Sequence, residues 1–317
     1  MWKKLGQECA TNGVSFDSYF FPSSYMDLAT VGCISALSGG DQFLYTAFDA
    51  NKHGAKFAND LQMTLSRNFG YDALLRVRAS AGLKVADYFG NFYMKNDTDV
   101  DLAGVDSLKA VGVGLQYDGK LDERADVYIQ MALLYTTADG HRRVRVHNLV
   151  LGVASQLNNV FRNAEMDCTV NFLARSMVQQ TYSMPLKAIR DLATTTCVKI
   201  LGAYRANCAT SSSDGQLILP EAFKLMPLYT LSMLKSRAFR SGKIVPSDLR
   251  VYTMRLFQQL GVAETTAYLY PSVYDLTHVD PEVGKINQNG MMKFPPILRA
   301  SIDRLSANGV YLAGIAL

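Results

Sequence analysis

The chain has 317 residues, of which 49% are hydrophobic and 19% charged, and its formal net charge is +4. This composition argues against disordered and collagen-like classes, and the length favours two or three domains. The mild charge, without a dense run of lysine and arginine, disfavours dedicated nucleic-acid binding. No apolar stretch reaches the about 18 residues of a membrane span and the first residues lack a signal-peptide core, so we expect a cytosolic chain.

The first 48 residues alternate between helical and strand patterns. Apolar spacing predicts, in order, helix 3–12, strand 14–21, helix 25–37 and strand 42–48. Asn12-Gly13 is a stop signal for the first helix, and Ser24 is a possible cap of the second. This alternation is typical of the end of an α/β domain with a mostly parallel sheet.

After a short predicted helix over 60–69, strand patterns dominate the sequence. They cover residues 73–79, 83–93, 110–117, 128–137 and 143–153. Asp139-Gly140 stands between the last two strands, which predicts an antiparallel hairpin. Strands at this spacing indicate a β-sandwich or a β-barrel.

From about residue 155 the apolar residues fall at helical spacing. Helices are predicted as far as about residue 266, among them one over 223–239 and one over 247–259 that Ser247 can cap. We therefore expect an all-α domain over 154–266. The chain opens on a helical pattern and stops inside an apolar, strand-like run over 310–317, so we expect a fragment of a longer protein.

Motifs for catalysis or cofactor binding are not found in the sequence. It contains no G-x-S-x-G, Walker A, H-E-x-x-H or G-x-G-x-x-G motif, and its five cysteines include no C-x-x-C pair. Sparse cysteines fit a reducing compartment rather than a zinc site. Asp97, Asp99 and Asp101 alternate as in a calcium loop, but no liganding glutamate follows, so we interpret them as a solvated loop. We expect no cofactor, no metal ion and no enzymatic activity.

The run 75–79 carries two arginines at strand spacing. Because side chains alternate along a strand, Arg76 and Arg78 project from one face about 7 Å apart, and their guanidinium groups suit carboxylates. The pattern fits a receptor for an acidic peptide or an anionic surface, with a solvated sheet face as the alternative. Leu134 is a candidate apolar anchor beside them, with a place in the sandwich core as its alternative. A second run puts Arg143, Arg145 and His147 on one side of a later strand.

Short motifs keep one order along nearly the whole chain. They lie at 75–80 (LRVRAS), 88–92 (YFGNF), 130–137 (QMALLYTT), 142–145 (RRVR), 217–220 (LILP), 227–229 (PLY), 238–242 (AFRSG), 244–248 (IVPSD) and 309–312 (GVYL). In this order they resemble the Sec24 subunits of the COPII vesicle coat, within the Sec23/Sec24 family. The sister subunit Sec23 shares the architecture but lacks the LILPE…PLY and FRSG-type signature, which favours Sec24.

The resemblance implies a multidomain α+β fold class. In the family's domain order, the chain would hold the C-terminal part of an α/β von Willebrand A-like trunk (1–49), an antiparallel β-sandwich (50–153), an all-α helical domain (154–268), and a linker with the start of a gelsolin-like domain (269–317). The family's zinc finger lies outside this chain, so the resemblance implies no metal ion or other cofactor here.

The resemblance also implies a cargo adaptor. Such a protein pairs with a Sec23-like subunit and binds export signals on the cytosolic tails of membrane proteins, for transport from the endoplasmic reticulum to the Golgi. One family cargo site, for acidic di-acidic and LxxLE-like signals, matches Arg76, Arg78 and Leu134. The implied location is cytoplasmic, on the endoplasmic reticulum membrane and COPII vesicles, against an acidic lipid surface and without nucleic acid.

Two alternatives to the adaptor stay open. One is a structural coat component that reads no cargo, and the remote one is a hydrolase with an unrecognised site. The stripe of Arg143 and Arg145 receives no cargo role, since it fits either a structural role or contact with acidic lipid headgroups.

Overall fold

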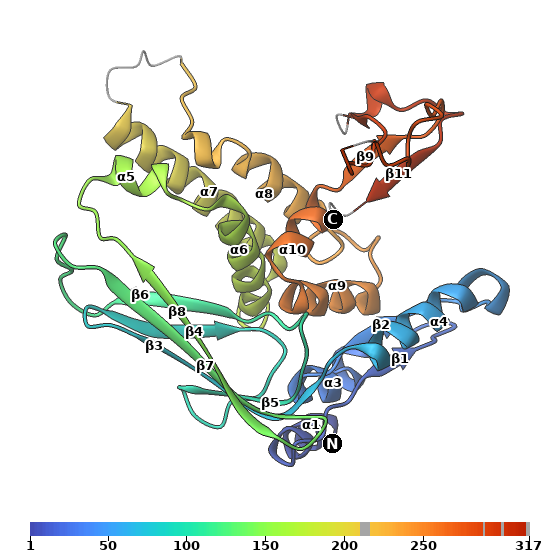
Figure 1. Ribbon diagram of the computed structural model, residues 1–317, viewed down its shortest axis with the longest axis horizontal. Coiled ribbons are helices and arrows are strands. Elements are labelled where there is room, and N and C mark those ends of the chain that lie inside the picture. Colours follow the sequence, from blue (N-terminus) through green and yellow to red (C-terminus); the bar gives the residue numbers. More distant parts are fainter. Residues whose placement is uncertain (210–215, 288, 299–300, 315–317) are drawn as a thin grey trace. The chain divides into compact units, whose positions relative to one another are not determined.

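The structure, a computed structural model, describes residues 1–209, 216–287, 289–298 and 301–314 (Figure 1). The chain divides into two compact units, Met1–Gly261 and Val262–Leu317. Within the described ranges, no helix combines the length and the apolar character needed to cross a lipid bilayer. All five cysteines are free thiols.

The first unit starts with a small parallel sheet and its helices. Its strands and helices are β1 (Ser18–Phe20), β2 (Gln42–Leu44), α1 (Trp2–Thr11), α2 (Leu28–Val31), α3 (Cys33–Ser38) and α4 (Ala50–Ser66). The two strands pair in parallel, which confirms the predicted α/β character. Tyr19 of β1 stacks on Phe43 of β2 and meets Phe57 of α4 edge-on, so aromatic rings fasten the helix to the strands.

Two helices of this part differ from their predicted form. The helix expected over 25–37 is divided into α2 and α3. It starts only at Leu28, because the preceding Asp27 has a left-handed backbone (φ 58°). Ser24 gives α2 no side-chain cap in the described structure. The helix expected over 60–69 starts at Ala50 instead. The carboxylate of Asp49 accepts a hydrogen bond from the backbone N–H of Asn51 (2.8 Å) and so caps this earlier start.

Two antiparallel sheets follow and confirm the predicted β-sandwich. The strands are β3 (Gly70–Ala79), β4 (Leu83–Phe89), β5 (Asp99–Val105), β6 (Gly112–Tyr117), β7 (Val127–Thr137) and β8 (Arg142–Leu151). One sheet has the order β5-β3-β7-β8, and β4 pairs with β6 in the other. The β7–β8 hairpin turns at Asp139-Gly140 as predicted. The core between the sheets contains Leu75, Val100 and Leu102.

Strand β5 contradicts the interpretation of Asp97, Asp99 and Asp101 as a solvated loop. Asp99 and Asp101 lie within this strand, and each is only 8% exposed. Val100 and Leu102 alternate with them and enter the core, which is the period-two pattern of a strand. Aspartate is depleted in strands, so its presence hid this pattern in the sequence.

Helices fill the rest of the first unit, as the apolar spacing predicts. They are α5 (Leu157–Arg162), α6 (Met166–Gln180), α7 (Leu186–Cys208), the 3-10 helix η1 (Glu221–Phe223), α8 (Met226–Lys235) and α9 (Ser247–Gln259). The helix expected over 223–239 is shorter, because α8 starts only at Met226 with a proline in its first turn.

The predicted cap of α9 is wrong. Ser247 is the first helical residue and Pro246 precedes it, and the described structure shows no side-chain cap there. The carboxylate of the next residue, Asp248, bonds instead to the N-terminal part of the unit. It accepts hydrogen bonds from the backbone N–H groups of Met26 (2.9 Å) and Leu28 (2.8 Å) and so caps α2.

Arg175 of α6 joins the helices to the sandwich. Its fully buried guanidinium donates hydrogen bonds to the carbonyl oxygens of Phe89 in β4 (3.1 Å), Gln258 in α9 (2.7 Å) and Leu260 (2.7 Å). Burial lowers its pKa to about 10. Its Nε also donates a hydrogen bond to the side-chain amide oxygen of Asn171 (3.0 Å). Within the described ranges no salt bridge joins it to a carboxylate, so the dipoles of carbonyl and amide groups balance its charge.

The second unit contains helix α10 (Val262–Leu269) and an antiparallel sheet with the order β10-β9-β11. The strands are β9 (Ser272–Asp275), β10 (Ile297–Leu298) and β11 (Tyr311–Gly314), and η2 (Ile302–Arg304) is a 3-10 turn. The strand predicted over 310–317 is present as β11 up to Gly314, and residues 315–317 lie outside the described residues.

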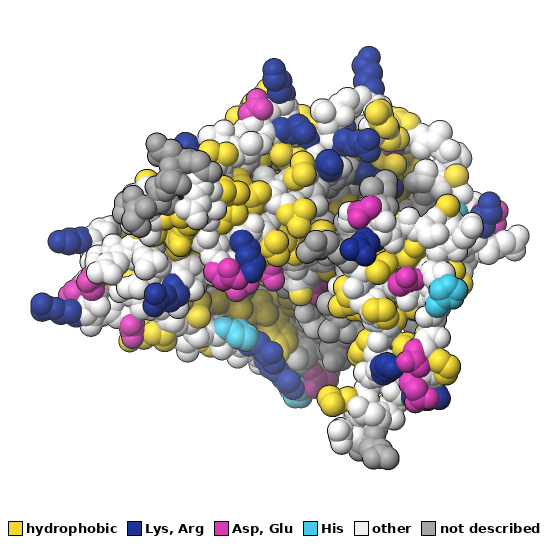
Figure 2. All heavy atoms as spheres, turned by 90° about the horizontal axis from the view of Figure 1, so that it is seen from above, with side chains coloured by type: hydrophobic (Ala, Val, Ile, Leu, Met, Phe, Trp, Pro, Cys, Tyr) yellow, Lys and Arg dark blue, Asp and Glu magenta, His cyan; other side chains and the backbone are white. Residues whose placement is uncertain are grey.

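Charge is dispersed over the surface. On the face in Figure 2, lysine and arginine side chains occur singly or in small groups among hydrophobic and acidic ones. This agrees with the small net charge of +4. On this face the charged side chains therefore form local groups rather than one large charged field.

Candidate functional site

Strand β3 carries the predicted arginines on the outside of the sandwich. Leu75 and Val77 are buried, whereas Leu74, Arg76 and Arg78 alternate with them and share the opposite face. The predicted direction of the two arginines is therefore confirmed by the backbone.

Register brings residues of β7 and β8 onto the same outer face. Read from β3 through β7 to β8, its three cross-strand rows are Leu74, Leu134 and Val144; Arg76, Ala132 and Val146; and Arg78, Gln130 and Asn148. We call these nine residues the outer face. Leu134 thus lies on the same side as Arg76 and Arg78, and the face changes from apolar to polar along the strands.

The apolar end of the outer face is open to solvent. Val144 is 63% exposed and Val146 is 48% exposed, and Leu134 is half-buried between the neighbouring strands. Exposed β-branched side chains in a row offer an apolar strip on which a ligand side chain can pack.

Arg76 is held by an acidic residue that the sequence analysis missed. Its Nε and Nη2 donate hydrogen bonds to the two carboxylate oxygens of Asp99, at 2.5 and 2.6 Å, in a bidentate fork. The fork lowers the pKa of Asp99 below its usual value. Asp99 faces Arg76 directly in the β3–β5 register, so a correct strand prediction for β5 would have found this pair.

Arg78 differs from Arg76 because β5 does not reach it. That strand begins at Asp99, opposite Arg76, so Arg78 has a neighbour only on the β7 side, where it faces Gln130. Gln130 itself donates a hydrogen bond to Asn148 (3.0 Å). Among the described residues, Arg78 has no hydrogen bond or ion pair and is exposed, so its guanidinium is available to a ligand.

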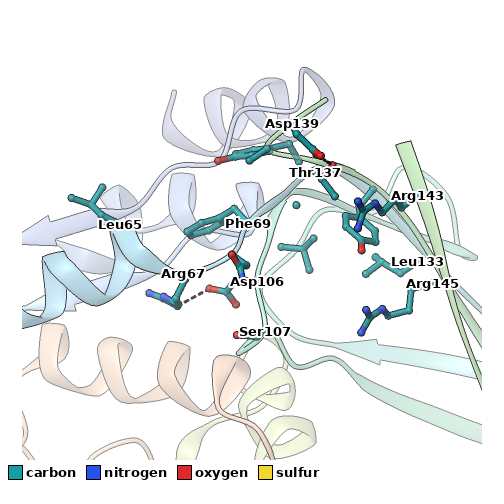
Figure 3. Close-up of a pocket in the computed structure, with 16 residues that line it drawn as sticks. Leu65, Arg67, Phe69, Asp106, Ser107, Leu133, Thr137, Asp139, Arg143 and Arg145 are labelled. Atoms are coloured by element: carbon teal, nitrogen blue, oxygen red, sulfur yellow. Dashed lines mark hydrogen bonds and ion pairs between the residues drawn. The ribbon is translucent and has the colours of Figure 1, made fainter. Parts of the chain in front are cut away.

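A hollow of about 820 Å³ lies on the other face of β7 and β8 (Figure 3). Leu133 and Tyr135 line it together with Arg143 and Arg145, and none of the predicted site residues does. The two arginine patterns, similar in sequence, therefore lie on opposite faces of one sheet.

The hollow is bounded by the segment after α4. Figure 3 shows Arg143 and Arg145 beside Leu133, with Arg67 and Asp106 across from them. Arg67 is bonded to Asp106 (2.6 Å) and to Asp41 (2.8 Å), so its charge is already matched. Within the described part of the chain, no three His, Cys, Asp or Glu side chains converge as a metal site requires.

Family models of three domains match the chain in sequence order. The Sec23/Sec24 trunk domain matches residues 1–65, the Sec23/Sec24 beta-sandwich domain residues 70–154, and the Sec23/Sec24 helical domain residues 165–267. The outer face lies within the second of these matches.

Curated relatives align over nearly the whole chain. Human protein transport protein Sec24C is 40% identical over 311 residues and human Sec24D is 36% identical over 312, and both alignments cover 98% of this chain. Arabidopsis thaliana protein transport protein SEC24 B is 36% identical over 313 residues, again 98% of the chain. The chain spans only 28%, 30% and 28% of the lengths of these relatives.

A solved structure has the same fold. The crystal structure of the human COPII-coat protein Sec24c matches with a TM-score of 0.90 and 38% sequence identity, covering 99% of this chain and 40% of that one.

Proposed function

The chain belongs to the Sec23/Sec24 family, as a Sec24-type member with the trunk, β-sandwich and helical domains, and from this premise we propose that it is a cargo adaptor of the COPII coat. In this role it binds export signals on the cytosolic tails of membrane proteins during transport from the endoplasmic reticulum to the Golgi. The multidomain α+β fold class is confirmed, while the boundaries expected at residues 49, 153 and 268 stay predictions.

One observation carries the proposed binding role. The outer face joins Arg78, an exposed arginine that makes no hydrogen bond or ion pair among the described residues, to an apolar row that contains the half-buried Leu134 and the exposed Val144. An extended peptide can lie along such a face, with a carboxylate bonded to the arginine and an apolar side chain on the row.

The proposed partners follow from the family. We propose that a Sec23-like subunit pairs with the chain and that acidic or LxxLE-like sorting signals are its ligands, at the surface of the endoplasmic reticulum membrane. A short tail buries little area and loses conformational entropy on binding, so we expect dissociation constants of micromolar order or weaker. Display of many copies on a coat raises the avidity.

A peptide titration tests the proposed site. We expect Arg76→Ala with Arg78→Ala to weaken binding of a fluorescent LxxLE-like peptide at least about tenfold, because the exposed guanidinium of Arg78 is lost and Asp99 is left beside the ligand without Arg76. Leu134→Glu should weaken it similarly, since it places a negative charge on the apolar row. Fluorescence anisotropy gives the affinities and circular dichroism checks the fold.

The chain offers a matched control for this test. Arg143→Ala with Arg145→Ala removes the same charge from the opposite face of the sheet and should leave the affinity unchanged. Equal peptide affinity in the Arg76 and Arg78 double variant and in the unmodified chain would refute the site. Unchanged cargo packaging in that variant would favour a structural coat component that reads no cargo.

A further inference from the structure

The loop between α8 and α9 carries a dense group of positive charges. The segment 235–243 contains no acidic residue and four exposed cations, namely Lys235, Arg237, Arg240 and Lys243, which we call the loop cations. Among the described residues, none of these four side chains makes a hydrogen bond or an ion pair. Their charge is therefore available to an anion from outside the chain.

Two half-buried guanidinium groups fix the backbone of this loop. Arg250 of α9 donates hydrogen bonds from Nη1 to the carbonyl oxygens of Ala238 (3.1 Å) and Arg240 (2.9 Å). Arg190 of α7 donates from Nη1 to the carbonyl oxygen of Phe239 (2.8 Å). These bonds turn the carbonyl oxygens, which repel anions, toward the helices. Because the loop is ordered before a ligand arrives, binding costs less conformational entropy.

A turn at the start of the loop places two arginines side by side. The backbone N–H of Arg240 donates to the carbonyl oxygen of Ser236 (2.9 Å), which closes one helical turn. Ala238 and Phe239 within this turn are fully buried. Arg237 and Arg240 are three residues apart, and side chains at this spacing are neighbours on a helical turn. The two guanidinium groups can thus bond to one anion together.

Further hydrogen-bond donors follow directly after the arginines. Ser241 has an exposed hydroxyl, and the backbone N–H groups of Ser241, Gly242 and Lys243 make no hydrogen bond within the described residues. A phosphate group on a side chain carries close to two negative charges and three acceptor oxygens, so it can use several cations and donors at once. A carboxylate has one charge and two oxygens, and it would leave most of these donors unmatched.

We propose that the α8–α9 loop is a binding site for a phosphorylated serine or threonine of a protein partner, in which Arg237 and Arg240 bond to the phosphate. A lipid bilayer fits the loop less well, because acidic headgroups spread over a plane attract cations spread over a wide face. The loop cations instead lie within nine residues of the chain. This site uses other elements than the outer face and does not depend on the proposed cargo role.

A peptide titration tests the site. The probe is a fluorescent, otherwise uncharged peptide with one phosphoserine, and its reference is the same peptide with serine. We expect the full chain to bind the phosphorylated peptide at least about tenfold more tightly, and added salt to weaken this binding. Arg237→Gln with Arg240→Gln should lower the affinity to that for the serine peptide. Because the backbone carbonyls of these residues hold the loop, we expect this variant to keep its fold, which circular dichroism checks.

Two arginines of the sandwich provide the matched control. Arg143→Gln with Arg145→Gln removes the same charge from β8 and should leave the affinity for the phosphorylated peptide within about twofold. Equal losses in the two double variants would mean that net charge alone attracts the peptide, which would overturn the site. Equal binding of the two peptides by the unmodified chain would also overturn it.

Vesicles test the other source of phosphate. Ile244, next to the loop cations, is 76% exposed, and a lipid surface can use such an apolar side chain as well. Vesicles of phosphatidylcholine and phosphatidylserine are sedimented with the unmodified chain and with the Arg237 and Arg240 double variant. We expect the same bound fraction of both proteins. Loss of vesicle binding in the variant, without any preference of the unmodified chain for the phosphorylated peptide, would assign the loop to the membrane and refute the proposal.

Discussion

At the scale of single residues, Arg76 and Arg78 show how position determines what a side chain can do. They are of the same type and lie on the same face of one strand, but Arg76 forms a bidentate fork with Asp99, whereas Arg78 makes no hydrogen bond or ion pair among the described residues and acts on Asp99 only through its charge. The difference arises because the neighbouring strand starts opposite Arg76. The first residue of β5 thus sets the number of free charges on the outer face.

The fork predicts how Asp99 responds to acid. Hydrogen bonds from Arg76 lower its pKa in the folded chain. A carboxyl group with a depressed folded pKa adds stability that is present above its unfolded pKa and is lost as the pH falls through the folded value. We expect Arg76→Gln to raise the pKa of Asp99, measured by carboxyl carbon NMR during an acid titration.

A distant arginine is the control for that titration. Arg145 lies on β8, facing away from the fork, so Arg145→Gln should leave the titration of Asp99 where it is in the unmodified chain. An unchanged pKa in Arg76→Gln would mean that the fork does not form in solution.

The sequence predicts the direction of a side chain better than its partner. Alternation along β3 depends only on adjacent residues, so the shared face of Arg76 and Arg78 is predictable. Asp99 lies 23 residues from Arg76, and their pairing depends on a strand register that one sequence does not reveal. The sequence therefore predicts the two arginines of the site but not the carboxylate of Asp99 that pairs with Arg76.

At the scale of elements, β8 is an open sheet edge within the described structure. All ten of its residues are exposed, and it pairs with β7 without a register shift. Its exposed residues include Val150 and Leu149. The strand is long and regular, and its last three residues, Leu149, Val150 and Leu151, form an exposed apolar run. Such an edge presents unpaired backbone groups to other chains, so this chain by itself is expected to self-associate through that end of β8.

Charge on this edge should reduce self-association. We expect Val150→Lys to lower the sedimentation coefficient distribution toward the monomer, because lysine on an edge strand opposes further strand pairing. Val198→Lys is the control, since Val198 is 63% exposed on helix α7 and adds the same charge away from any strand edge. Equal effects of the two substitutions would point to net charge rather than to the edge.

Elements defined by local signals were predicted more accurately than those fixed from a distance. The β7–β8 hairpin follows from alternation and its Asp139-Gly140 turn. The start of α2 does not, because Asp248 caps it from a position 220 residues away from Leu28. The sequence around residue 28 gives no sign of a hydrogen-bond partner so far away in the chain.

At the scale of the whole chain, polar contacts tie the N-terminal part of the first unit to its helices. Besides the cap from Asp248, Asp41 accepts hydrogen bonds from Gln259 (2.5 Å) and from Arg67 (2.8 Å). In two of these contacts the partners are more than 200 residues apart, so these hydrogen bonds join the first and the last segments of the unit in space.

Removal of the Asp248 cap tests this connection. We expect Asp248→Ala to cost about 1–2 kcal/mol, as for the loss of a helix N-cap, and to speed hydrogen exchange in residues 26–38. Asp248→Asn retains one acceptor oxygen and should cost less. If hydrogen exchange in residues 26–38 is as slow in Asp248→Ala as in the unmodified chain, the side chain of Asp248 does not stabilise α2.

The buried guanidinium of Arg175 predicts which contacts of the first unit open first in acid. Acid neutralises carboxylates but leaves a guanidinium charged, and dissolved ions have little access to the fully buried group of Arg175. On acidification, the contacts of α2 should thus open before those between β4, α6 and α9. The sandwich and the helices would then unfold as one cooperative block, after the N-terminal part has separated from them.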